Sequence, residues 1–316
     1  MSLHTVNILG IKITSDPEIT ILKEFRKYLE DGAFGKRQGM KKIKKPLFIA
    51  TPNPEQIVIA QTDTHFRNIL NGADVALPDG IGIVWANRIL HKPITSNVQP
   101  TTLNTIPGVS FMEELTKDAA KRGYPVALIG GRDGVALKAF ECLHRKYPSL
   151  RGWAVDGPEI QKTNHGICIT EDGEGISPII HNTKSIIHSP NTENAYFQTL
   201  ITRIFDSHVH FVFVGLGAPK QEYFIERITE YVLRIIGKKR GLSSAIIHNS
   251  STLPLVLMSV GGSFDEIAGK VPKAPAYISV LELKWLWRLL HEPWRLWRQL
   301  RLFKFVFLVL KERFAL

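Results

Sequence analysis

Two short polar segments of the chain carry residue types that can do chemistry, and each lies between an apolar run and a helical pattern. Thr51, Pro52 and Asn53 follow the apolar run 46–50, and Pro54 suits the first turn of a helix. Asp79 follows the apolar run 73–77 and stands between a proline and a glycine. Short polar side chains and free backbone donors at two such points favour one cleft for an anionic ligand. The alternative is that Asn53 and Asp79 only cap the helices that follow them.

Two glycine-containing turns follow later apolar runs. Gly130 and Gly131 open the segment Gly-Gly-Arg-Asp-Gly, which has the layout of a diphosphate-binding turn but lacks the full G-x-G-x-x-G spacing. A plain left-handed turn has the same appearance. The second turn contains Gly215 and Gly217, then a proline, and then Lys220, Gln221 and Glu222 in one helical turn. A purely structural helix start has little need of that mixture, so we expect a binding site there. Solvation of the surface is the alternative for Lys220 and Glu222.

Predicted strands and predicted helices alternate along the chain and could position these residues. Short apolar runs predict strands at Val6–Ile11, Pro46–Ala50, Ala73–Leu77, Val126–Ile129, Trp153–Val155, Val209–Val214 and Leu255–Val260. Apolar residues at steps of three and four predict helices at Glu18–Leu29, Pro54–Leu70, Ile81–Leu90, Ser110–Arg122, Gly134–Tyr147 and Pro219–Ile236. Alternation of this kind predicts an α/β fold, a Rossmann-like and mainly parallel sheet with crossover helices. Ligands of such sheets bind at the carboxyl ends of the strands, where the polar segments lie.

Composition bounds the class of protein. The chain has 316 residues, 44% of them hydrophobic and 22% charged, which suits a globular protein of one or two domains. Two segments, 157–206 and 237–252, break the alternation, and we expect them to be insertions in a core that spans 1–276. Two distant cysteines indicate a reducing, cytoplasmic setting, and no apolar run is long enough to span a membrane.

The net charge of +11 is concentrated near the C-terminus. Residues 284–316 hold eight Lys or Arg, two acidic residues and four of the six tryptophans. Leu296, Leu300, Phe303, Phe307, Leu310 and Phe314 form an apolar stripe at helical spacing. We therefore predict that residues 277–316 form a helical appendage that binds an anionic membrane surface. Packing on the core, or on another subunit of a homo-oligomer, is the alternative. Nucleic acid is disfavoured as a partner, because the cations lie beside bulky aliphatic side chains.

The sequence lacks the motifs of several classes of enzyme. No Asp-x-Asp pair is present, and the motifs of zincins, serine hydrolases and P-loop enzymes are absent. His208 and His210 have the spacing of a metal pair on one strand, but no third ligand stands in an evident motif, so we interpret them as ordinary histidines. We expect neither a metal nor a cofactor.

Ordered motifs along nearly the whole chain resemble the WecG/TagA/CpsF family of bacterial glycosyltransferases. They are Thr51-Pro52-Asn53, the segment Ala73–Gly82, Gly108-Val109-Ser110, Gly130-Gly131, Val214–Glu222, Val260–Asp265, Ala274-Pro275 and the tryptophan-rich segment from Leu281. The resemblance implies transfer of an N-acetylmannosamine-type sugar from UDP to an undecaprenyl-diphosphate-linked N-acetylglucosamine. It further implies inversion, no metal, and an enzyme peripheral to the inner face of the cell membrane that serves teichoic acid or other surface polysaccharide synthesis.

The resemblance also implies roles for particular residues. Asp79 would be the general base that takes the proton of the acceptor hydroxyl, and Thr51 and Asn53 would orient the sugar. Residues on the donor side would be Gly130, Gly131, Gly215, Gly217, Gln221 and Glu222, and Arg288, Arg295 and Arg298 would neutralise a diphosphate. Arginine is a natural source of that charge where no metal supplies it.

Two other functions stay open on the sequence alone. The α/β alternation and the glycine turns are also compatible with a dinucleotide-binding oxidoreductase, although no full fingerprint supports one. Thr105 stands where the family usually has arginine, which is compatible with a membrane adaptor that has lost catalysis.

Overall fold

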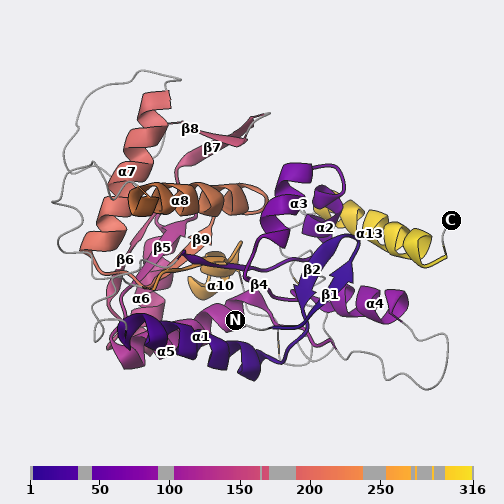
Figure 1. Cartoon of the computed structure of the whole chain (residues 1–316), viewed down its shortest axis with the longest axis horizontal. Coiled ribbons are helices and arrows are strands. Elements are labelled where there is room, and N and C mark those ends of the chain that lie inside the picture. Colours follow the sequence, from indigo (N-terminus) through magenta and orange to yellow (C-terminus); the bar gives the residue numbers. More distant parts are fainter. Residues whose placement is uncertain are drawn as a thin grey trace. The chain divides into compact units, whose positions relative to one another are not determined.

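The computed structural model describes residues 3–34, 45–91, 103–163, 166–170, 190–237, 254–271, 275, 287 and 296–314. Its central sheet has six strands in the order β4-β3-β10-β9-β5-β6, and every pairing given for it is parallel (Figure 1). Its strands are β3 (Leu47–Ala50), β4 (Val75–Ala76), β5 (Val126–Gly130), β6 (Gly152–Val155), β9 (Phe211–Gly215) and β10 (Val256–Ser259). The predicted Rossmann-like α/β fold is therefore confirmed.

The chain divides into two compact units. Unit 1 combines Met1–Glu24, Ile49–Phe111 and Gly269–Leu316, and unit 2 combines Phe25–Phe48 and Met112–Ala268. The helices are α1 (Glu18–Phe34), α2 (Pro54–Ala60), α3 (Thr64–Asn71), α4 (Ile81–Leu90), α5 (Gly108–Arg122), α6 (Val135–Lys146), α7 (Pro190–Asp206), α8 (Lys220–Gly237), α10 (Ser263–Ile267) and α13 (Leu296–Phe314). The expected boundary between a core and an appendage near residue 276 stays a prediction.

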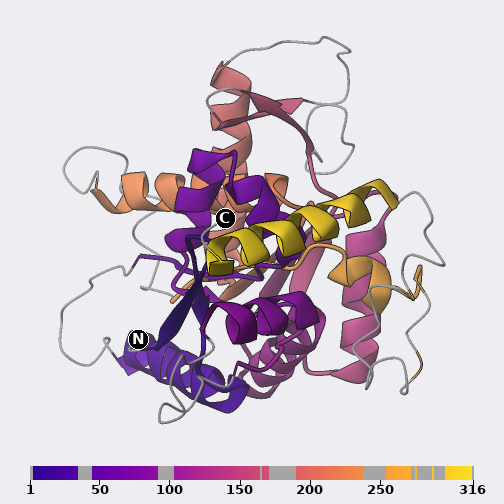
Figure 2. The same cartoon turned by 90° about the vertical axis from the view of Figure 1, so that its right-hand side faces the viewer.

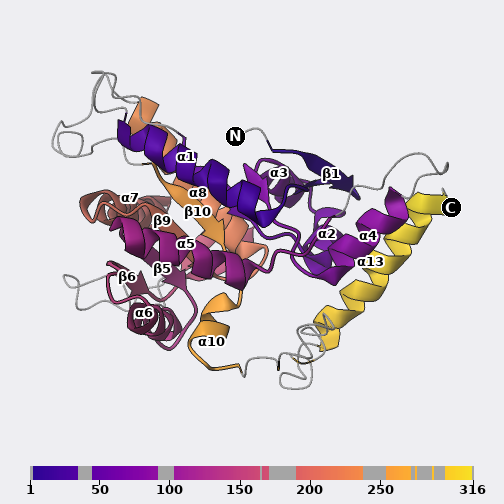
Figure 3. The same ribbon diagram turned by 90° about the horizontal axis from the view of Figure 1, so that it is seen from below.

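Unit 2 is a layered α/β body. Its strands β5, β9 and β10 are buried along their whole length, as is usual for parallel strands covered on both faces. Helices α7 and α8 lie on one face of these strands and α5 and α6 on the other (Figures 1 and 3). The apolar runs that predicted these strands are thus the centre of the core.

Segment 157–206, which the sequence predicts to be an insertion, contains regular secondary structure. It contains β7 (Glu159–Thr163) and β8 (Gly166–Thr170), which pair antiparallel, and then α7. The side chains of Phe197, Leu200, Ile201 and Ile204 on α7 are buried, so this helix belongs to the core of unit 2. The helical spacing of the apolar residues in α7 was not recognised in the sequence, because a long polar stretch precedes this helix. Residues 171–189 and most of the second predicted insertion lie outside the described residues.

Unit 1 corrects two further predictions. Instead of one strand at Val6–Ile11, β1 (Thr5–Ile8) and β2 (Ile11–Thr14) form a hairpin, because Leu9 and Gly10 both take positive φ angles, 52° and 81°. Instead of one helix at Pro54–Leu70, the chain breaks between α2 and α3, where the Asp63 side chain accepts a hydrogen bond from the Phe66 amide at 3.0 Å. In both places a local turn or cap overrides the apolar periodicity.

Helix α13 packs along α2 and α4 within unit 1 (Figures 2 and 3). Phe305 and Val309 on its inner face are fully buried. The stripe expected from the sequence is on the opposite side: Leu300, Phe303, Phe307, Leu310 and Phe314 are between 36% and 73% exposed. Helix α13 therefore has two apolar faces, of which one faces outward.

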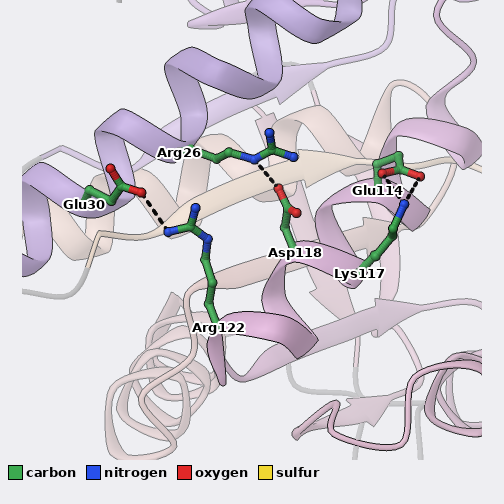
Figure 4. A network of polar contacts seen from close by, with 6 residues as sticks. All are labelled: Arg26, Glu30, Glu114, Lys117, Asp118 and Arg122. Carbon is green, nitrogen blue, oxygen red and sulfur yellow. Dashed lines mark hydrogen bonds and ion pairs between the residues drawn. The ribbon is translucent and has the colours of Figure 1, made fainter.

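Ion pairs join α1 to α5 within unit 2 (Figure 4). Arg26 Nε lies 2.7 Å from Asp118 Oδ2, and Arg122 Nη1 lies 2.9 Å from Glu30 Oε1. Asp118 is 14% exposed, whereas Lys117 and Glu114 form a more exposed pair within α5. The Arg26–Asp118 pair therefore has the better-shielded carboxylate.

We predict that Asp118→Ala lowers the free energy of unfolding by about 0.5–1 kcal/mol, because Arg26 is partly exposed and solvent screens the pair. The control Lys117→Ala should cost about 0.3 kcal/mol, the value of an exposed pair within one helix. Urea unfolding of both variants measures the difference. Equal costs would show that the contact between α1 and α5 contributes nothing specific.

Candidate active site

The two polar segments predicted from the sequence lie together in unit 1. Strands β3 and β4 are parallel neighbours, with Ala50 opposite Ala76, so both segments leave the sheet at the same edge. The Asp79 amide donates to the Pro52 carbonyl at 3.1 Å, and the Leu77 amide donates to the Ala50 carbonyl at 2.8 Å. The expectation that Thr51, Asn53 and Asp79 share one region is therefore confirmed as geometry.

Asn53 is the N-cap of α2, and its Oδ1 accepts from the Gln56 amide at 3.0 Å. The capping alternative is thus correct for the carbonyl of this side chain, while its amide nitrogen can still act as a donor. Asp79 is different, because the N-cap of α4 is Gly80, with φ of 94°. The Asp79 carboxylate is half-buried and lies one residue before the cap position.

Glycines let the helices of unit 1 approach this region closely. A Cβ on Gly108 would lie 3.0 Å from Thr51 Cγ2, so the start of α5 rests on the Thr51 side chain, which is 5% exposed. A Cβ on Gly82 would lie 2.6 Å from Pro54 Cγ, so the first turns of α4 and α2 touch. The positions of Thr51 and Asp79 are therefore fixed by backbone packing as well as by hydrogen bonds.

The glycines of unit 2 mainly serve packing of the strand ends. A Cβ on Gly130 would lie 2.5 Å from the Gly215 carbonyl oxygen, and one on Gly215 would lie 2.7 Å from the Phe264 ring. The Gly131 amide donates to the Gly215 carbonyl at 2.9 Å. Gly217 has φ of 74° with open space beside it. Only Gly217 of these four therefore leaves room for a ligand against its α-carbon.

The turn after β5 differs from an open diphosphate site. Asp156, directly after β6, accepts from the Gly134 amide at 2.9 Å through Oδ2. A carboxylate thus already occupies a donor at the start of α6, where a diphosphate would need a free amide and no negative neighbour. The plain left-handed turn, which the sequence left open, describes this segment better. Asp156 could have been found by examining the residue after the predicted strand.

Gln221 and Glu222 form a buried polar connection between α8 and the turn after β10. Gln221 Nε2 donates to Glu222 Oε1 at 2.8 Å, and Gln221 Oε1 accepts from the Gly261 amide at 2.9 Å. The two side chains are 1% and 0% exposed, so the alternative of surface solvation is wrong for Glu222. Sequence reasoning gave no role to Ser259 or Gly261, although Ser259 lies near the end of a predicted strand and Gly261 lies in the motif Val260–Asp265.

Burial raises the pKa of the Glu222 carboxyl to about 7, and hydrogen bonding with the Gln221 and Ser259 side chains offsets only part of that effect. The group is therefore largely protonated at mildly acidic pH. A neutral carboxyl beside the Gln221 amide holds the connection without a buried charge.

The remaining candidates are described only in part. His208 and His210 direct Nδ1 to backbone carbonyls, at 2.9 Å each, and His210 stacks on Tyr124 with ring centroids 4.2 Å apart. Within the described ranges, no three side chains of the metal-binding types cluster. Arg288 and Arg295 lie outside the described residues, and the side chain of Arg298 is not described. None of the helices described is long and apolar enough to cross a membrane.

The fold and these strand-end loops define an α/β enzyme of the Rossmann type. Comparison with known proteins gives the class: the model of the glycosyl transferase WecG/TagA/CpsF family matches residues 24–237 and 243–316, and the chain belongs to that family. The chain is therefore a glycosyltransferase, and the oxidoreductase alternative is not supported. The chain is 27% identical over 271 residues to an N-acetylglucosaminyldiphosphoundecaprenol N-acetyl-beta-D-mannosaminyltransferase of Bacillus spizizenii, covering 86% of this chain and 81% of that protein.

The raised pKa of Glu222 predicts how stability depends on pH. Between pH 4.5 and about 7 the unfolded chain ionises this carboxyl while the folded chain keeps it protonated, so the free energy of unfolding falls as pH rises. Glu222→Gln should remove this fall, so its stability relative to the wild type should improve from pH 5 to pH 7.5 in urea unfolding. Glu141→Gln, at an exposed position on α6, is the control and should follow the wild type. The prediction fails if the free energy of unfolding falls with rising pH equally in Glu222→Gln and in the wild type.

Proposed function

We propose that the chain transfers an N-acetylmannosaminyl group from a UDP donor to the N-acetylglucosamine of an undecaprenyl-diphosphate lipid, with inversion and without a metal. The product would enter teichoic acid or another surface polysaccharide. Family membership and the printed activity of the Bacillus spizizenii relative support this proposal. The observation that carries it is the hydrogen bond from the Asp79 amide to the Pro52 carbonyl, which holds Asp79 against the segment that contains Thr51 and Asn53.

An inverting transfer needs one base on the acceptor side of the anomeric carbon. In the proposed mechanism Asp79 accepts the proton of the acceptor hydroxyl as that oxygen attacks, and the bond from the anomeric carbon to the UDP oxygen breaks. The Asn53 amide nitrogen and the Thr51 hydroxyl orient the sugar, since Asn53 Oδ1 is already used as a helix cap.

The donor contacts and the charge for the leaving diphosphate are assigned to residues that the family resemblance implies. We assign donor contacts to the loop that contains Gly215 and Gly217, with Gln221 and Glu222 as the buried support of this loop. Arg288, Arg295 and Arg298 would neutralise the departing diphosphate, because guanidinium groups bind phosphate oxygens in pairs.

The outward face of α13 supports membrane contact. Five apolar side chains are exposed on one face, Phe303 and Phe307 at 73% and 64%, on a helix that also exposes Lys304 and Lys311. Aromatic and basic groups together favour an anionic lipid interface. We infer that the protein is a peripheral protein of the inner face of the cytoplasmic membrane, with α13 as its contact.

Incubation with UDP-N-acetylmannosamine and a short-chain lipid-diphosphate acceptor tests the activity, with the glycolipid identified by mass spectrometry. Asp79→Asn should lower kcat by about 10²–10⁴-fold, because it removes the base and keeps the shape. Asp206→Asn, an exposed change at the end of α7, is the control and should retain full activity. Release of UDP without glycolipid, or full activity of Asp79→Asn, would contradict the proposal.

The double variant Phe303→Ser/Phe307→Ser should bind anionic phosphatidylglycerol vesicles at least tenfold more weakly, since each lost aromatic contact is worth about 1.5–3 kcal/mol when fully buried. Vesicle flotation measures the partition. The control Leu137→Ser/Leu233→Ser removes two exposed apolar side chains from α6 and α8, which are 51% and 42% exposed. Equal loss in both double variants would show that α13 has no special role at the membrane.

A further inference from the structure

Unit 1 contains a pocket of about 760 Å³ that the proposed mechanism does not use. One wall comes from the two ends of the β1–β2 hairpin and the first turn of α1, with His4, Asp16 and Glu18 among its residues. The other wall is the segment Asn104–Ile106, just before α5. All of the residues that line it belong to unit 1, so this unit forms the pocket by itself.

Both walls are hydrogen-bonded to the end of β4 and the residues that follow it, directly before Asp79. The Ile106 amide donates to the carbonyl of Pro78, the residue before Asp79, at 2.9 Å. Thr14 Oγ1 accepts from the Ala76 amide at 3.0 Å, and Ser15, which lines the pocket, follows directly. The pocket is therefore built onto the backbone on both sides of the segment that presents the Asp79 carboxylate.

The lining disfavours an anion. Two carboxylates, Asp16 and Glu18, belong to the lining, and none of the described lining residues is Lys or Arg. The one basic group, His4, is held by Asp16, which accepts from the His4 amide at 2.5 Å and contacts His4 Nδ1 at 3.1 Å. A diphosphate would meet negative charge here without compensation.

The same lining suits a neutral sugar ring. Thr5, Ser15 and Thr105 contribute hydroxyl groups, and the exposed Asn104 contributes an amide that both donates and accepts. Val6, which is half-buried, contributes apolar surface, against which a face of a pyranose ring can pack. A few polar groups on a partly apolar wall are typical of a site that fixes the orientation of a small molecule.

The chemistry of the proposed transfer indicates whether the donor sugar or the acceptor sugar fits this pocket. In the donor, the reacting carbon itself carries the diphosphate, so its reacting end is the charged end and needs cations close by. In the acceptor, the diphosphate is on one ring carbon and the attacking hydroxyl on another, so the reacting end is neutral. A pocket that has no Lys or Arg among its described lining residues, and that is hydrogen-bonded to the segment just before the proposed base, therefore fits the acceptor ring.

We propose that this pocket holds the N-acetylglucosamine ring of the lipid-linked acceptor, with its attacking hydroxyl toward Asp79 and its diphosphate outside. This assignment rests on the proposed function. It makes Asn104 a determinant of acceptor binding that plays no part in donor binding.

The test places a large side chain at the exposed position Asn104. Asn104→Trp should raise the acceptor KM at least tenfold in the glycolipid assay, while the UDP-sugar KM stays within twofold. Asn68→Trp puts the same side chain at an exposed position on α3, outside the pocket, and should change neither constant. Circular dichroism of both variants verifies that they fold.

A second measurement does not depend on turnover. Saturation-transfer NMR with methyl N-acetylglucosaminide should detect binding to the wild type and to Asn68→Trp, and no binding to Asn104→Trp. An unchanged acceptor KM in Asn104→Trp, or a rise in the donor KM instead, overturns the pocket assignment while the proposed function stands. Binding that depends on Asn104 in a wild type that makes no glycolipid overturns the proposed function and supports the pocket as a site for a neutral sugar.

Discussion

The hydrogen bond between the Asp79 amide and the Pro52 carbonyl is the contact on which the arrangement of unit 1 depends. It continues the ladder between β3 and β4 by one step beyond their ends, so that two loops from different strands are held as one surface. Helices α2 and α4 begin in these loops, and Gly82 against Pro54 sets how closely they meet. The backbone therefore fixes where Thr51, Asn53 and Asp79 stand relative to one another.

The parts of the fold that could be predicted from the sequence are those that apolar periodicity controls. Strands β3, β5, β9 and β10 are short runs buried on both faces, and α4 begins and ends at the predicted residues, Ile81 and Leu90. The errors occur where one residue overrides the pattern. Leu9 takes a positive φ angle in the hairpin, and Asp63 caps a helix in the middle of an apolar repeat. Neither residue stands out in a sequence of ordinary composition.

In the candidate site too, the features that follow from the fold could be predicted, whereas those that depend on single side chains could not. Thr51 and Asp79 could be placed together because parallel neighbouring strands end at one edge, which follows from the fold alone. The bond from Gly261 to Gln221 could not be foreseen, since it joins residues 40 positions apart through one rotamer. The pocket of unit 1 could not be foreseen either, because it joins the N-terminal hairpin to Asn104, about 90 residues further along the chain, and neither the hairpin nor Asn104 lies in a motif. Family resemblance supplied residue roles that physical reasoning on one sequence does not reach.

The two apolar faces of α13 place neighbouring residues under different kinds of evolutionary constraint. A polar substitution at Phe305 or Val309 would disturb the core of unit 1, and selection for folding removes such changes. A polar substitution at Phe303 or Phe307 leaves the folded chain intact, so nothing in the fold opposes it. Packing within the chain therefore accounts for Phe305 and Val309 and gives no reason for the large apolar side chains at Phe303 and Phe307, only two residues away.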